Sequence, residues 1–145
     1  MRLESQFIHT TLYVKEETEI MKRDEFIKRV QEKAQVSSKD EAIWITDTVL
    51  KTLSERLTEK EAFDLASQLP HELKGIVGGA KERLVKMDRQ EFVNKVADNL
   101  NITPDESEMY IKATFSVLKS AIVPGEIRDV LDQLPNDLAA MLAEA

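Results

Sequence analysis

Two aspartates at matched positions are the side chains whose spacing first suggests shared chemistry. Asp64 and Asp129 are each the fourth residue of the pattern Glu-x-x-Asp-x-x-x-Gln-Leu-Pro-x-x-Leu, which covers residues 61–73 and again residues 126–138. In one interpretation, the aspartates form matched polar sites across a pseudo-two-fold axis. In the other, they are structural, since a carboxylate and a glutamine four residues apart hydrogen-bond along one helix, and identical residues in repeats reflect shared ancestry and packing.

The remaining residue types form no recognisable catalytic motif. The chain has two histidines, His9 and His71, and the second stretch has Asn136 where the first has His71, which indicates an exposed turn position. Cysteine is absent, and the sequence contains no nucleophile elbow, phosphate loop or dinucleotide-binding glycine pattern. We therefore predict no catalytic residue, no cofactor and no metal ligand, and we favour a protein that is not an enzyme. An enzyme would need a deep pocket lined by groups such as Asp64, His71 and Tyr110.

Carboxylates gather toward the C-terminal end of the sequence. Calcium sites of the loop type need oxygen ligands spaced around a tight turn, and these residues do not have that spacing. We interpret them as a solvated acidic face. They are Glu126, Asp129, Asp132 and Asp137.

Basic residues concentrate in the first expected helix of each repeat and suggest an alternative partner. Lys28 and Arg29 in the first repeat, with Lys95 in the second, are the candidate contacts for nucleic acid. Acidic residues are interleaved with them, and the net charge of −7 disfavours nonspecific binding to nucleic acid or to an anionic membrane. A mixed-charge surface is the competing interpretation.

Helix-capping patterns place the elements that carry these residues. Apolar residues recur at helical spacing over residues 22–34 and again after each cap. Residues 80–87, which bridge the two repeats, are interpreted as a segment that could continue helically into the next element. The expected capping boxes pair Ser38 with Glu41, Thr58 with Glu61, Asp88 with Glu91, and Thr103 with Glu106.

These patterns predict an all-α fold built by tandem duplication. Each residue of the second pattern lies 65 positions after its counterpart in the first. A unit of that length is marginal alone, so we expect two units of about four helices fused into one pseudo-two-fold domain. The expected organisation is an N-terminal extension over residues 1–20, repeat 1 over 21–79, and the bridge with repeat 2 over 80–145, with one fused domain over 21–145.

Aromatic residues at two positions are candidates for protein contact. Phe63 is apolar where the second copy has Arg128, so it marks a contact made by one half only, with the N-terminal arm or an oligomer surface as candidates. Trp44 widens the apolar stripe of the second expected helix. We list Trp44, Phe63, Asp64 and Asp129 as candidate interaction residues.

The lengths of the apolar runs and the order of the first residues indicate where the protein is located. The longest runs are far too short to span a bilayer, and the first residues lack the basic, apolar and small-residue order of a signal peptide. We therefore expect a cytoplasmic protein with no membrane partner.

The paired stretches resemble the prokaryotic family called domain of unknown function 2267. The resemblance rests on the Gln-Leu-Pro pattern and on the helices containing Phe26 and Phe92, and it extends from Met21 to about Leu142. It implies a helical bacterial or cyanobacterial protein and assigns no catalytic residue, cofactor or substrate. Our prediction is a non-enzymatic module for protein–protein interaction, including self-association, or for regulation, with nucleic-acid binding as the alternative.

Overall fold

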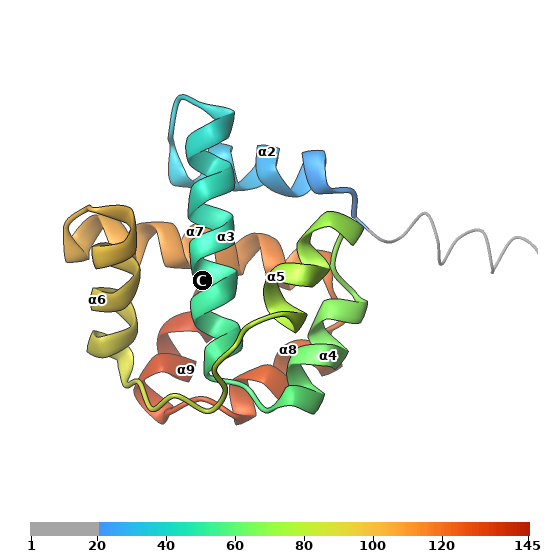
Figure 1. Ribbon diagram of the computed structural model, residues 1–145. Coiled ribbons are helices and arrows are strands. Elements are labelled where there is room, and N and C mark those ends of the chain that lie inside the picture. Colours follow the sequence, from blue (N-terminus) through green and yellow to red (C-terminus); the bar gives the residue numbers. More distant parts are fainter. Residues whose placement is uncertain (1–20) are drawn as a thin grey trace, which may run out of the picture.

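The computed structural model describes residues 21–145, and all regular secondary structure in this part of the chain is helical (Figure 1). No strand occurs between residues 21 and 145, so the all-α prediction is confirmed. None of the helices in this range is both long and apolar enough to cross a membrane. The expected extension over residues 1–20, including His9, lies outside the described residues.

Four α-helices form each half of the described chain, as the capping patterns predicted. The first half also has a short 3₁₀ turn, η1, directly after Pro70. Its elements are α2 (Arg23–Ala34), α3 (Lys39–Glu55), α4 (Glu59–Ser67), η1 (His71–Leu73) and α5 (Lys74–Gly78). Those of the second half are α6 (Arg89–Leu100), α7 (Pro104–Ala121), α8 (Pro124–Asp132) and α9 (Asn136–Ala143).

Helices α3, α4, α6 and α7 begin at the predicted N-caps Ser38, Thr58, Asp88 and Thr103. Asp88 and Thr103 form complete capping boxes, in which the glutamate three residues later also bonds back to the N-cap backbone. Ser38 accepts a hydrogen bond from the Glu41 amide at 3.0 Å, but Glu41 makes no return bond, so the predicted capping box is only half formed. Helix α7 starts with Pro104, whose missing N–H is not needed in the first turn.

The bridge over residues 80–87 is not helical, so the interpretation of a continuous helix was wrong. The Arg83 guanidinium donates to the carbonyls of Ser54 and Val77, at 3.1 Å and 3.2 Å, at the ends of α3 and α5. The amide of Val85 donates to Glu55 at 2.9 Å, and Leu84 has a φ of 55°. These bonds satisfy carbonyls that helix ends leave free, and they fix the path of the non-helical bridge.

Helices α3 and α7 form the centre of the fold, and the other helices pack around them (Figure 1). Helix α2 contacts α3 and α7, and so does α6. Phe26, Phe92 and Phe115 are fully buried in one core that both halves share. At the end of the molecule away from α2, α4 packs against α8, which brings the two Gln-Leu-Pro stretches together.

Candidate functional site

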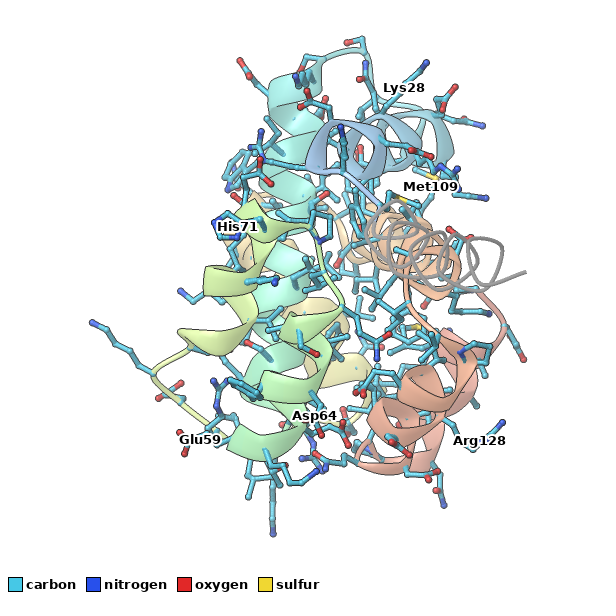
Figure 2. The ribbon with its side chains drawn as sticks, turned by 90° about the vertical axis from the view of Figure 1, so that its right-hand side faces the viewer. Lys28, Glu59, Asp64, His71, Met109 and Arg128 are labelled. Atoms are coloured by element: carbon cyan, nitrogen blue, oxygen red, sulfur yellow. The ribbon has the colours of Figure 1, made fainter. Side chains whose placement is uncertain are left out.

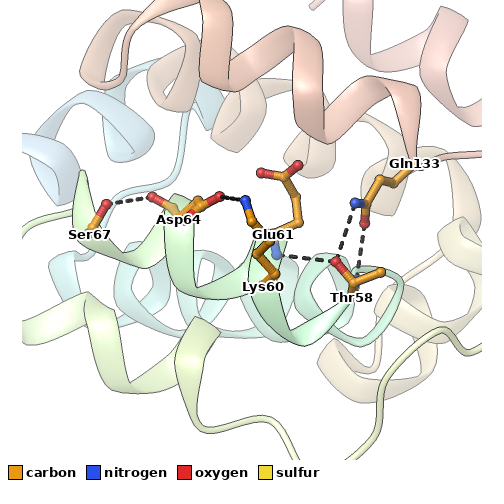
Figure 3. Close-up of polar contacts among 6 residues, drawn as sticks. All are labelled: Thr58, Lys60, Glu61, Asp64, Ser67 and Gln133. Atoms are coloured by element: carbon orange, nitrogen blue, oxygen red, sulfur yellow. Dashed lines mark hydrogen bonds and ion pairs between the residues drawn. The ribbon is translucent and has the colours of Figure 1, made fainter.

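Each of the helices α4 and α8 begins beside a glutamine from the end of the other. Gln133 Oε1 accepts the Thr58 N–H at 3.0 Å, and Gln68 Oε1 accepts the Val123 N–H at 2.9 Å (Figure 3 shows the first). Thr58 and Val123 are the N-caps of α4 and α8 and are separated by the repeat offset, as are the two glutamines. This reciprocity is what a pseudo-two-fold duplication predicts. It replaces the expected bonds between each glutamine and the aspartate four residues before it.

Because Gln133 bonds to the backbone of Thr58, Glu61 does not act as a capping residue. Thr58 Oγ1 accepts the Glu61 amide at 3.1 Å, but the Glu61 carboxyl does not complete the predicted capping box. In a capping box the Glu61 carboxylate would accept the Thr58 N–H, but here Gln133 Oε1 accepts that N–H instead. In Figure 3 the Glu61 carboxyl instead extends from α4 toward the C-terminal segment.

Three carboxyl groups converge between α4 and α8, and we call Glu61, Asp64 and Glu126 the carboxyl cluster. One oxygen from each lies within 4.8 Å of the others. Glu61 is 9% exposed and Glu126 is 7% exposed, and the Oε2 atom of each is buried without a hydrogen-bond partner in residues 21–145. The prediction that Glu126 belongs to a solvated acidic face was therefore wrong.

The surroundings of Glu126 disfavour its ionised form. Burial, followed by the Glu61 carboxyl and the charges of Asp64 and Asp129, raises the pKa of Glu126 to about 8. At neutral pH Glu126 therefore retains its proton.

Lys60 borders the cluster on its solvent side. Its ammonium pairs with Asp64 at 2.9 Å, and this hydrogen bond raises the pKa of Lys60 (Figure 3). Gly125 stands at the equivalent position of the second copy. Asp129 is exposed on α8, near enough for its charge to act on Glu126 and Lys60. Asp64 is thus part of the cluster, and Asp129 lies at its edge.

Helix α4 carries a second feature, which we call the Phe63 pocket. The Phe63 side chain is 71% exposed. It borders a hollow of about 360 Å³ between α4 and α5. The lining residues are Phe63, Ala66, Ser67, Lys74, Gly75 and Gly78. Trp44 is 53% exposed on α3 and is not among them.

The candidate nucleic-acid contacts lie on two helices that pack on different parts of the core. Lys28 is exposed on α2, and Figure 2 shows it at the opposite end of the molecule from Asp64. Arg29 is paired with Glu25 on the same helix. Lys95, on α6, pairs at 2.8 Å with Glu55, which is 7% exposed. Two of the three cations therefore already have an anionic partner.

The residues suggested for an enzyme pocket are not gathered in one place. Figure 2 shows His71 and Asp64 well separated, and His71 is exposed in η1. Tyr110 is buried on α7, where burial raises the pKa of its hydroxyl.

The pairing of Glu61 with Glu126 was not predicted from the sequence. Glu61 was assigned to a cap and Glu126 to solvent, because local spacing shows only neighbours along the chain. One signal was available, since glutamate is the first residue of the repeated pattern in both copies.

Comparison with known proteins agrees with the helical architecture and assigns no chemistry. A family model described as "Uncharacterized conserved protein (DUF2267)" matches residues 23–141. The search of curated proteins gave no match. Because the family model covers most of the chain, including both halves of the fold, the chain belongs to the DUF2267 family of uncharacterized conserved proteins.

Proposed function

We propose that this protein is a non-enzymatic protein–protein interaction module of the cytoplasm, with the Phe63 pocket as its contact surface. The occupant that the geometry favours is a second copy of the chain. The observation that carries the proposal is the 71% exposure of the Phe63 side chain directly beside an apolar hollow.

A projecting ring beside a hollow is a self-complementary surface. In a two-fold dimer each protomer presents the same patch, so each Phe63 ring enters the hollow of its partner. Burying a phenylalanine side chain that water now surrounds contributes ~1.5–3 kcal/mol, and the dimer gains this twice. The second half has Arg128 at the equivalent position, and Figure 2 shows this side chain extending from the surface. The proposed contact is therefore made by the first half alone.

The alternative function, nucleic-acid binding through α2 and α6, has weaker support. Phosphate binding draws its affinity from cations that are free to replace counterions. Arg29 and Lys95 are paired with Glu25 and Glu55, which leaves Lys28 as the exposed candidate without such a pair among the described residues.

Sedimentation velocity over a concentration series tests the proposal. Phe63→Arg introduces the residue that the second half carries, and we expect it to weaken dimerisation at least ~10-fold, since a charge replaces a buried ring. Trp44→Arg is the matched control, because it makes the same change at another exposed aromatic, and it should leave the dimer unchanged.

Three results would refute the proposal. One is a wild-type chain that stays monomeric at the highest concentrations, and another is a dimer that Phe63→Arg does not weaken. The third is salt-dependent binding to DNA or RNA that Lys28→Glu abolishes, which would favour the alternative function.

A further inference from the structure

We propose that the carboxyl cluster of Glu61, Asp64 and Glu126 is a binding site for a hard divalent cation, of the class of Ca²⁺, Mg²⁺ and Mn²⁺. The proposal concerns the face of α4 that meets α8, and it does not depend on the Phe63 pocket.

The first argument is that two buried carboxylate oxygens of the cluster have no cationic partner among the described residues. Buried carboxylate oxygens are normally paired with donors or coordinate metals, because leaving them unpaired is costly. Among the described residues, Glu61 Oε2 and Glu126 Oε2 receive no hydrogen bond from any donor other than the proton that Glu126 retains, although only 9% of Glu61 and 7% of Glu126 is exposed. A cation between them supplies the missing interaction to both oxygens.

The second argument is the spacing of the oxygens. Calcium–oxygen distances of 2.3–2.6 Å place opposite ligands ~4.6–5.2 Å apart, and magnesium at about 2.0–2.1 Å places them ~4.0–4.2 Å apart. The three oxygens of the cluster lie within 4.8 Å of one another, so one ion can reach all three with small side-chain adjustments. Every ligand is a carboxylate oxygen, which favours hard cations, and water would complete the coordination.

The third argument is that neither glutamate is used to cap its helix. Gln133 and Gln68 satisfy the starts of α4 and α8, at Thr58 and Val123, so neither Glu61 nor Glu126 is needed as a capping side chain. The ligands come from two helices of different repeats. A bound cation would therefore link α4 to α8, and with them the two halves of the molecule.

The Lys60 ammonium would compete with a bound cation for the Asp64 carboxylate. This ammonium pairs with Asp64 at 2.9 Å, so an incoming cation must share or displace this contact. The Lys60 side chain is 87% exposed and moves away at little cost. Replacing Lys60 by Gln should therefore strengthen cation binding by about 2- to 5-fold.

Isothermal titration calorimetry of the full chain with Ca²⁺, Mg²⁺ and Mn²⁺, each alone and at matched ionic strength, tests the proposal. We expect a dissociation constant of about 10⁻⁴ M or tighter for at least one of these ions. Glu61→Gln and Glu126→Gln should each weaken it at least ~10-fold. Asp132→Asn, the same change at an exposed position of α8, is the control and should leave it unchanged.

Nuclear magnetic resonance with substoichiometric Mn²⁺ locates the ion. Signals of residues 60–64 and 125–129 should broaden first, because paramagnetic relaxation falls steeply with distance. Titrations indistinguishable from added NaCl would overturn the proposal and leave the cluster occupied by a proton alone. Broadening centred elsewhere, or equal affinity in Glu126→Gln, would also overturn it. Phe63→Ser, which removes the ring without adding a charge beside the cluster, should bind the cation normally, so failure here is separate from failure of the dimer proposal.

Discussion

Replacing Glu126 by Gln should remove a pH-dependent loss of stability from the metal-free protein. In the unfolded chain this carboxyl ionises near its ordinary pKa of 4.5, whereas in the folded protein burial and the Glu61 carboxyl raise its pKa to about 8. Between these values the folded state binds the extra proton, so the free energy of unfolding falls as the pH rises. The stabilisation is complete below about pH 4.5 and is lost by about pH 8.

The size of this effect follows from the two pKa values. At ~1.4 kcal/mol per tenfold change in the ionisation equilibrium, the difference between 4.5 and about 8 corresponds to at most about 5 kcal/mol. Movement of the carboxyls toward water when Glu126 ionises reduces it, so we expect about 2–4 kcal/mol. Asp64 and Asp129 act in the opposite direction, because their charges disfavour a second ionised glutamate.

Urea unfolding in the presence of a chelator, followed by circular dichroism at about pH 5 and about pH 9, measures the effect. Glu126→Gln should gain about 2–4 kcal/mol relative to wild type on going from the lower to the higher pH. Asp132→Asn, at an exposed position of the same helix, should differ from wild type by less than ~0.5 kcal/mol at both. Equal pH dependence in wild type and Glu126→Gln would refute the reasoning, because it would mean that Glu126 ionises as readily in the folded as in the unfolded chain.

Three further changes test the glutamine contact at the start of α4, the cap of α7 and a buried ion pair. Gln133→Ala removes the acceptor of the Thr58 N–H and should cost ~1–2 kcal/mol in urea unfolding. It should also speed hydrogen exchange at Thr58, and an unchanged exchange rate would contradict the assignment. Thr103→Ala removes the cap of α7 and should cost ~0.5–2 kcal/mol, measured as a lower thermal midpoint, with Thr103→Ser as the control that keeps the hydroxyl. Lys95→Met leaves the Glu55 carboxyl buried without its ammonium and should cost ~1–3 kcal/mol in urea unfolding. A Lys95→Met protein as stable as wild type would show that this ion pair is not needed.

The local pattern of the sequence was enough to predict the helices and most of their starts. Caps depend on side chains within three residues of one another, so Asp88 with Glu91 and Thr103 with Glu106 could be identified without tertiary information. Apolar residues at helical spacing likewise identified the buried faces that contain Phe26 and Phe92.

The bridge and the carboxyl cluster could not be predicted in this way. The bridge is held in a non-helical path because Arg83 bonds to carbonyls at the ends of α3 and α5, and those ends meet only in the folded chain. Glu61 has the spacing of a capping residue, but Gln133 takes the N–H that Glu61 would have bonded.

The sequence by itself determined a helical chain with two matched halves, because periodicity, caps and the repeated pattern are local properties. Tertiary structure alone decided which matched residues meet. Packing α4 against α8 brings Glu61 to Glu126, which lies 65 residues later in the chain, and buries both. Burial is what makes this pair of carboxyl groups retain a proton on Glu126 or, as we propose, bind a cation.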